Sequence, residues 1–107
     1  MRSEALKGHL DMLVLSVLQG DPAHGYAVIQ RLAARSDGAF DLPEGTVYPA
    51  LYRLERGGLL VSSETVVDSR RRRVYRLTPA GEDALTARVV EWKSFARSVG
   101  RTLQAGV

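Results

Sequence analysis

The chain has 107 residues, of which 45% are hydrophobic, and this suffices for a single domain with a modest core. It contains no cysteine, no apolar run long enough to cross a bilayer and no signal-peptide pattern after Met1, so disulfides, thiolate metal sites and membrane spans are excluded and a cytoplasmic protein is expected. The net charge of +3 is concentrated in residues 68–77, where five arginines and one aspartate give +4, a local excess typical of a surface that meets a polyanion.

Residues 6–18 predict a first helix that is apolar on nearly every side. Met12 and Leu15 lie opposite the main apolar face, so we expect this helix to be buried on both sides. The main face consists of Leu6, Leu10, Leu13, Val14, Val17 and Leu18.

A second helix is predicted after a turn at residues 19–22. Its outward side carries Tyr26, Gln30 and Arg31. Its inner face is formed by Gly25, Val28, Ile29 and Leu32. Residues 36–42 then connect it to the next element.

The stretch EGTVYPALYRLERGG, residues 44–58, predicts a third helix that is amphipathic. Its buried stripe is Val47, Ala50, Leu51 and Leu54. The opposite side carries Tyr48, Pro49, Tyr52, Arg53 and Arg56. Two exposed phenols flanked by arginines indicate a contact surface, and the plain alternative is a pair of half-exposed tyrosines that cover a neighbouring loop.

Pro49 constrains where this third helix begins. Its missing N–H has no consequence if Thr46 is the N-cap, whereas a helix that begins at Glu44 would be bent at Pro49. Gly57 and Gly58 end the helix.

The pattern then changes to that of two strands, LLVSSETVV and RRRRVYRL, joined at a turn of Asp68 and Ser69. Tyr75 and Leu77 are expected to face inward. The basic tip projects toward a polyanion, and the alternatives are a solvated hairpin tip or a localisation-type basic run.

A final long helix begins after Thr78 as N-cap, with Pro79 as its first residue. Apolar residues recur in it at alternating spacings of 4 and 3: Leu85, Val89, Trp92, Ala96, Val99 and Leu103. This heptad seam needs a partner helix. It could pack on the first helix of the same chain, but the rest of the domain is too small to cover it all, which favours a homodimer.

The element order predicts a mainly α fold with a small β-hairpin, namely a winged helix-turn-helix with a long C-terminal dimerisation helix. We expect residues 1–78 to form the DNA-binding domain and residues 79–107 the dimerisation helix, the two packed as one compact unit.

Four segments resemble the PadR family of bacterial transcriptional regulators: LKGHLDMLVLSVL, HGYAVIQRL, EGTVYPALYRLERGGLL and RRRRVYRLTPAGEDAL. The resemblance runs from Leu6 to about Leu103, and the single short C-terminal helix is similar to the family's smaller class. It implies a dimeric winged-helix repressor whose third helix enters the major groove of double-stranded DNA, whose wing follows the backbone or minor groove, and whose first and last helices form the homodimer. The wing departs from the family pattern, because DSRRRR has no glycine before the arginines.

The residue pattern and the resemblance together give two sets of site residues. The DNA-binding set is Tyr26, Thr46, Tyr48, Pro49, Tyr52, Arg53, Arg56, Arg70, Arg71, Arg72 and Arg73. Tyr26 is similar to the tyrosine of the family's HGY motif and would hold a phosphate beside the second helix, or else cover the helix junction. The dimer set is Leu6, Leu10, Leu13, Leu85, Val89, Trp92, Ala96, Val99 and Leu103.

Trp92, the only tryptophan, lies in the seam. The plain expectation is a core aromatic that fills the dimer interface. The resemblance to drug-responsive members implies instead that Trp92 and Phe95 bind a small planar aromatic effector between the protomers, with the first-helix leucines as the remaining wall.

Enzyme chemistry is disfavoured by the same sequence. Its only histidines, His9 and His24, lie far apart and form no HExxH pattern, and no Gly-rich phosphate loop is present, so no metal or cofactor is predicted. The alternative from another class is a winged-helix module that binds a protein through its exposed aromatics without binding DNA, and the basic tip argues against it.

Overall fold

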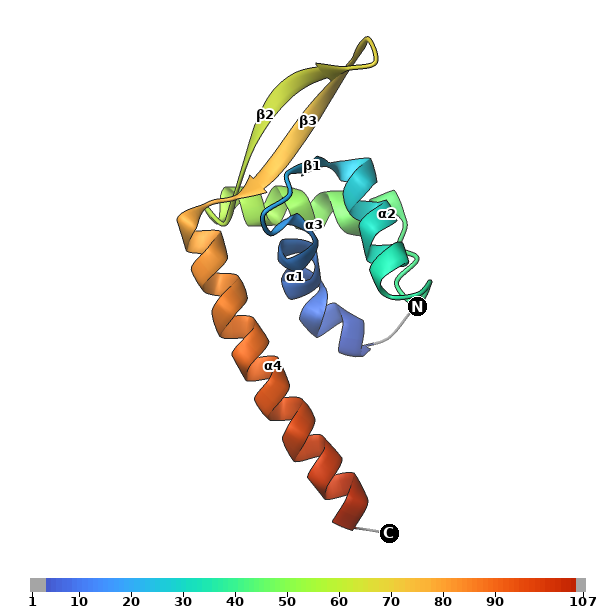
Figure 1. Cartoon of the computed structure of the whole chain (residues 1–107), viewed down its shortest axis with the longest axis vertical. Coiled ribbons are helices and arrows are strands. Elements are labelled where there is room, and N and C mark those ends of the chain that lie inside the picture. The colour runs from blue at the N-terminus through green and yellow to red at the C-terminus, as the bar shows by residue number, and fades with distance from the viewer. Residues whose placement is uncertain (1–3, 106–107) are drawn as a thin grey trace.

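The computed structural model describes residues 4–105. The elements follow the chain in the order α1 (Glu4–Leu18), β1 (Ala23–His24), α2 (Gly25–Arg35), α3 (Glu44–Arg56), β2 (Leu60–Val67), β3 (Arg70–Leu77) and α4 (Pro79–Ala105) (Figure 1). The predicted mainly α, winged helix-turn-helix architecture is confirmed, with one short strand, β1, that was not predicted. The predicted DNA-binding domain, residues 1–78, and the predicted dimerisation helix, residues 79–107, each include residues outside the described range, namely 1–3 and 106–107.

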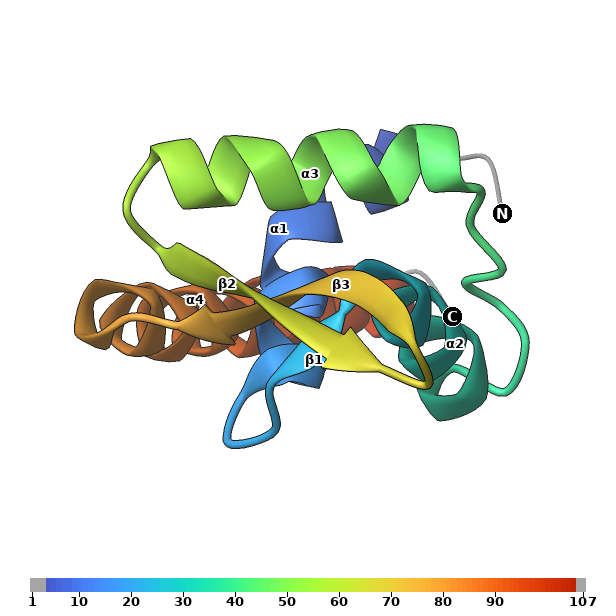
Figure 2. The ribbon, with the colours of Figure 1, turned by 90° about the horizontal axis from the view of Figure 1, so that it is seen from above.

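The core forms where the first three helices meet the root of the hairpin. The second half of α1 is enclosed there, with Val14 and Leu15 both 0% exposed, and α3 packs over it (Figure 2). Leu6, Leu10 and Leu13 of the same helix are only half-buried in the single chain. The buried stripe of α3 is the predicted one: Val47, Ala50, Leu51 and Leu54.

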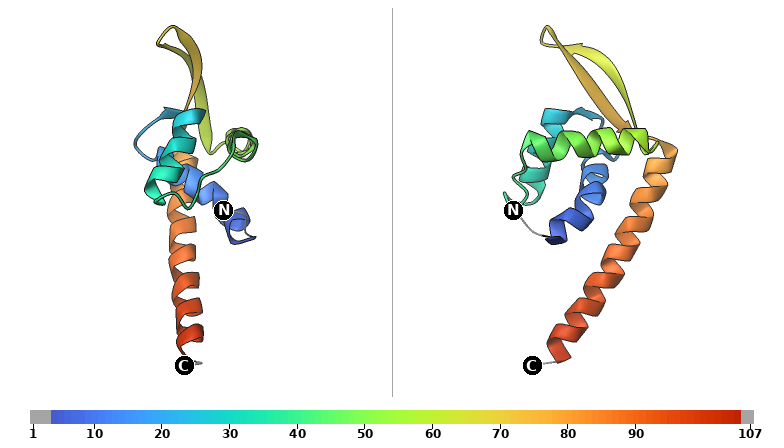
Figure 3. Two further views of the ribbon diagram at one scale, coloured as in Figure 1. Left: turned by 90° about the vertical axis from the view of Figure 1, so that its right-hand side faces the viewer. Right: turned by 180° about the vertical axis from the view of Figure 1, so that it is seen from behind.

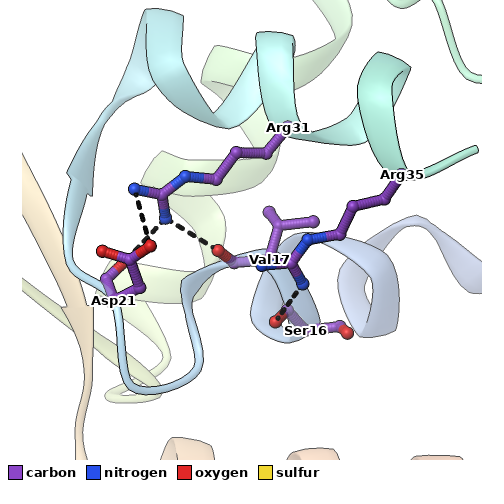
Figure 4. Close-up of polar contacts among 5 residues, drawn as sticks. All are labelled: Ser16, Val17, Asp21, Arg31 and Arg35. Atoms are coloured by element: carbon purple, nitrogen blue, oxygen red, sulfur yellow. Dashed lines mark hydrogen bonds and ion pairs between the residues drawn. The ribbon is translucent and has the colours of Figure 1, made fainter.

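Two arginines of α2 supply the hydrogen bonds that the C-terminus of α1 lacks (Figure 4). Arg31 donates to the carbonyl oxygens of Val17 at 2.9 Å and Asp21 at 2.6 Å, and its guanidinium lies 3.2 Å from the Asp21 carboxylate. Arg35 donates to the Ser16 carbonyl at 3.3 Å. The last carbonyls of a helix have no partner within the helix, and α1 carries no basic residue in its own last turn. The prediction that Arg31 points outward is therefore wrong.

The start of α3 decides between the two alternatives for Pro49. The helix begins at Glu44 with Pro43 as N-cap, and the Pro43 carbonyl accepts from the backbone N–H groups of Thr46 and Val47. Because this first turn is already closed upstream, Thr46 is not the N-cap and Pro49 lies inside the helix.

The wing is a hairpin whose turn matches the prediction to the residue. Val67 pairs with Arg70, so Asp68 and Ser69 form a two-residue loop, and both have positive φ, 52° and 63°. Two-residue loops with positive φ at both positions fit the right-handed twist of hairpin strands. β1 adds to the other edge of β3, which gives a three-stranded sheet in the order β1-β3-β2. Tyr75 faces the core as predicted and is 8% exposed.

The root of the wing also fixes the start of α4. The Thr78 hydroxyl accepts from the Gly81 N–H at 3.0 Å and donates to the Gly58 carbonyl at 2.6 Å, which confirms Thr78 as N-cap. A Cβ on Gly81 would lie 2.1 Å from the Leu59 carbonyl oxygen, so only glycine permits this close packing.

Beyond its first turns α4 leaves the body of the domain (Figure 3). Leu85 is 3% exposed and Val89 packs against the core, but Trp92, Phe95 and Leu103 are 41%, 59% and 68% exposed. The distal half of the helix is thus uncovered within one chain. None of the helices in the described range 4–105 is long and apolar enough to span a membrane.

Candidate nucleic-acid interface

The outer side of α3 presents the aromatic and basic residues that its helical spacing predicted. Tyr48 and Tyr52 are 40% and 61% exposed; the Tyr48 ring packs against Gly25 at the start of α2, whereas Tyr52 is largely open. The Arg56 guanidinium carbon lies 5.7 Å from the centroid of the Tyr52 ring, within the range of a cation–π contact. Pro49 is exposed beside them and Thr46 is half-buried at the first turn.

Arg53 has an intramolecular partner that the sequence did not reveal. Its guanidinium forms an ion pair with the Asp11 carboxylate of α1, whose side chain is only 22% exposed. The basic group expected to contact DNA is therefore held beside a carboxylate in this structure. No periodicity argument could have found Asp11, because it lies 42 positions away in the chain.

The arginines of β3 differ in their surroundings. Glu64, on β2, lies 3.6 Å from Arg71 and 3.9 Å from Arg73, so two of the five arginines of β3 share one carboxylate. Arg70 closes the hairpin at its turn and is exposed. Arg72 is half-buried and has no ion pair among residues 4–105.

The start of α2 lies close to these arginines. Tyr26 is 49% exposed in its first turn, on the outward side as predicted. His24 is the N-cap of α2, and its Nδ1 accepts from the Ala27 N–H at 3.2 Å. Burial, followed by the charges of Arg72 and Arg31, lowers the pKa of His24 from its ordinary value, which favours the neutral imidazole.

Comparison with known proteins shows which family this chain belongs to. The model of the Transcriptional regulator PadR-like family matches residues 14–87. The chain belongs to the PadR-like family of transcriptional regulators. It is 46% identical over 85 residues to the transcriptional regulator Rv3488 of Mycobacterium tuberculosis, a match that covers 78% of this chain and 77% of the relative.

Solved structures agree with this assignment to the PadR-like family. A transcriptional regulator from Clostridium thermocellum is similar with a TM-score of 0.85 at 27% identity, covering 92% of this chain and 97% of the other. A PadR family regulator from Eggerthella lenta gives 0.80 at 36% identity, with 94% and 86% covered. Family membership implies DNA-binding regulation and places the chain among regulators, not enzymes.

Most residues of the predicted dimer set, and both residues of the predicted effector site, lie on α4 of this PadR-like chain. Leu85 is buried in the core of its own chain, which leaves little of its side chain for a partner. Trp92 stands edge-on to His9 of α1 with 4.9 Å between ring centroids, and 6.3 Å from the Phe95 ring. A hollow of about 270 Å³ opens there between α1 and α4, lined by Gly8, His9, Met12, Arg88, Glu91, Trp92 and Phe95.

A second hollow, of about 390 Å³, adjoins it and shares three lining residues, His9, Met12 and Trp92. Its lining is almost entirely apolar: Ala5, Leu6, His9, Met12, Leu13, Phe40 and Trp92. Within one chain Trp92 is therefore not a core aromatic, but borders open space. Leu6 and Leu13 line this space as predicted for an effector wall, and Leu10 does not. Phe40 comes from the connection between α2 and α3, and its contribution was missed because a loop carries no periodic pattern.

Proposed function

We propose that this PadR-like regulator is a homodimeric repressor that binds an inverted-repeat operator in double-stranded DNA through α3 and the wing. The observation that carries the proposal is the exposed side of α3, where Tyr48, Tyr52 and Arg56 stand next to a wing whose residues 68–77 have a net charge of +4. Tyrosine hydroxyls and guanidinium groups are suited to phosphates and base edges in the major groove. A basic wing supplies the salt-dependent contact to the backbone.

The homodimer is supported by the uncovered part of α4. Phe95, Val99 and Leu103 lie at helical spacing and are 59%, 38% and 68% exposed. An apolar stripe of this length on an isolated helix is unfavourable in water, and a second copy provides the same stripe in return. The half-buried leucines of α1 extend the surface. In this proposal residues 1–78 contact DNA, residues 79–107 join the protomers, and the protein acts in the cytoplasm.

Selection from a random pool of duplex DNA tests this function directly. The expected result is a recovered motif with two inverted half-sites whose centres are about one helical turn, or ~34 Å, apart. Recovery of no motif, together with no gel shift on bulk DNA, would contradict it. A repressor, in turn, should lower transcription from a promoter that carries the recovered motif.

A winged-helix module that binds another protein remains the competing function, because α3 exposes its aromatics to either kind of partner. Salt dependence separates the two. DNA binding should weaken steeply between low and physiological salt, because each phosphate contact releases counterions, whereas an aromatic protein contact should change little.

A planar aromatic effector is the proposed signal. The hollows beside Trp92, of about 270 and 390 Å³, have a size suited to a flat ring system, and Trp92 lines both. Such a compound releases the operator only if it binds the two dimer arrangements unequally. Saturable quenching of Trp92 fluorescence by planar aromatic dyes, absent in Trp92→Ala and accompanied by a shift in operator affinity, is the expected result.

A further inference from the structure

A cleft of about 180 Å³ lies between the wing, the start of α2 and the start of α3. β1 pairs with β3 only as far as His24, opposite Val74, while β3 extends further to Arg70. The arginines that precede Val74 therefore lie past the end of β1, next to the first turn of α2. The lining consists of His24, Gly25, Tyr48, Arg71, Arg72, Arg73 and Tyr75, and contains no carboxylate.

Most polar groups of this cleft can only donate hydrogen bonds, and the hydroxyls of Tyr48 and Tyr75 can both donate and accept. His24 accepts from the Ala27 N–H with Nδ1, so the neutral imidazole carries its proton on Nε2, where it can only donate. The adjacent N–H groups at the first turn of α2 have no partner within the helix. Guanidinium groups have no acceptor at all. Because donors outnumber acceptors in this cleft, it suits a ligand with several acceptor oxygens.

Tyr48 is held at the cleft by a glycine. A Cβ built on Gly25 would lie 2.4 Å from Tyr48 Cε1 and 3.0 Å from its hydroxyl oxygen. The φ angle of Gly25 is not positive, so backbone freedom does not explain the glycine there. What it permits is the close approach of the tyrosine, whose hydroxyl thereby reaches the cleft.

Arg72 is the cation of the cleft that remains available. Arg71 and Arg73 are partly neutralised by Glu64, at 3.6 and 3.9 Å, whereas the half-buried Arg72 has no carboxylate partner in the described part of the chain. A half-buried guanidinium without a counter-ion is unfavourable until an anion binds it.

We propose that this cleft binds a single backbone phosphate of DNA, with Arg72, the Tyr48 hydroxyl and His24 Nε2–H as its ligands. The proposal rests on DNA binding as the function of the chain and assigns one specific contact within it. The phosphate would join elements from three parts of the sequence, so its binding fixes the wing relative to α2 and α3. Contacts of this kind position a protein on the duplex without reading bases.

Methylphosphonate substitution, which removes the charge of one phosphate at a time, tests this contact. Duplexes that carry the recovered operator with one neutral linkage at each successive position are titrated with the chain, with Arg72→Gln and with Arg70→Gln. Arg70 is the matched control, because it lies on the same strand with the same charge but outside the cleft lining. One linkage per half-site should weaken binding of the unchanged chain and of Arg70→Gln by about tenfold or more.

The same linkage should have no further effect on Arg72→Gln, since the contact is already lost. If every linkage weakens Arg72→Gln as much as the unchanged chain, the phosphate site is wrong while DNA binding stands. If the unchanged chain binds no DNA, the proposed function fails and the site fails with it.

Two further variants separate a ligand from a structural role. Tyr48→Phe keeps the ring against Gly25 and removes only the hydroxyl. His24→Asn keeps an N-cap acceptor for Ala27 and removes the Nε2–H donor. Each should reduce the effect of the identified linkage several-fold with an unchanged melting temperature. Unreduced effects in both variants would overturn their assignment as ligands.

Discussion

Asp11 illustrates how a single residue would limit DNA affinity in the proposed function. Its carboxylate holds Arg53, on the exposed side of α3, in an ion pair whose acidic partner is 22% exposed. A phosphate that approaches Arg53 must therefore compete with Asp11. On the wing, Glu64 stands in the same relation to Arg71 and Arg73. In the proposed function both carboxylates oppose binding to any polyanion, and only an operator that adds base contacts can offset this cost.

Replacing Asp11 with Asn should therefore raise affinity for random DNA more than affinity for the operator. The freed Arg53 can form about one additional phosphate contact, which steepens the dependence of log K on log salt by roughly 0.9. Gel shifts on operator and random duplexes over a salt series measure both quantities. Asp41→Asn, which removes a charge from a residue without an ion pair in residues 4–105, is the control. Equal gains in the two variants would show that the ion pair has no specific role.

His24 makes stability depend on pH. Its pKa is lowered in the folded chain by burial, then by Arg72 of β3 and Arg31 of α2, relative to the ordinary 6.5. As pH falls below about 6.5, the unfolded chain takes up the proton first, so the free energy of unfolding decreases until the folded-state pKa is passed. Protonation also removes the Nδ1 acceptor from the cap of α2.

Urea unfolding between pH 8 and 5 should therefore show a loss of stability that begins near pH 6.5 and is reduced in His24→Asn, which keeps a capping oxygen but does not titrate. His9→Asn is the matched control and should retain the loss. An identical pH profile for His24→Asn and the unchanged chain would assign the loss to other groups.

The helices and strands could be predicted from the sequence wherever neighbouring residues alone decide a turn or a helix end. Asp68 and Ser69 were predicted as the turn because strand patterns end on either side, and Thr78 as an N-cap because Pro79 follows it. The start of α3 was open, because the choice depended on whether the carbonyl of Pro43 closes the first turn. β1 is too short for any periodicity and exists only through its pairing with β3.

The candidate site could likewise be predicted only in part. Exposed positions on α3 and the wing follow from helical and strand spacing. Contacts between helices do not, and these include Asp11 with Arg53 and Gly25 beneath Tyr48. Each joins residues whose proximity is created only by the packing of separate helices. Glu64 differs, because the predicted two-residue turn places it directly opposite Arg73 in the hairpin.

Arg31 is the element-scale contact with the largest expected effect on stability. Its removal leaves the carbonyls of Val17 and Asp21 without their donor and the C-terminus of α1 uncapped. Arg31→Ala should lower the free energy of unfolding by about 1–3 kcal/mol, measured by urea titration. Arg35→Ala removes a single exposed bond of 3.3 Å and should have a smaller effect. If both variants unfold at the same urea concentration as the unchanged chain, α2 does not stabilise α1 through these bonds.

The whole molecule measures 58 × 28 × 20 Å, and its long axis runs from the wing at one end to the far part of α4 at the other (Figure 1). DNA contact and self-association are therefore proposed for opposite ends of the chain. Only the first turns of α4 are buried, so the distal stripe can be altered without disturbing the core. This separation makes the dimer testable by substitutions that spare the fold.

Val99→Asp should convert the dimer to a monomer and weaken operator binding by at least an order of magnitude, because two linked half-sites bind far more tightly than one. Val90→Asp is the matched control, since it places the same charge on the same helix outside the seam, at a residue that is 64% exposed. Sedimentation and gel shifts measure both properties. A Val99→Asp protein that still sediments as a dimer would place the interface elsewhere.

The close packing at Gly81 has a consequence for which DNA spacings the protein can accept. α4 is about 40 Å long at 1.5 Å per residue, so a tilt of about 5° at its first turn would displace its far end by roughly 3.5 Å. Gly81 lies against the Leu59 carbonyl, at the joint between wing and helix. In a dimer joined through α4, this one joint would set the distance between the two DNA-contacting surfaces. A methyl group added at Gly81 would then change the preferred number of base pairs between half-sites without touching DNA.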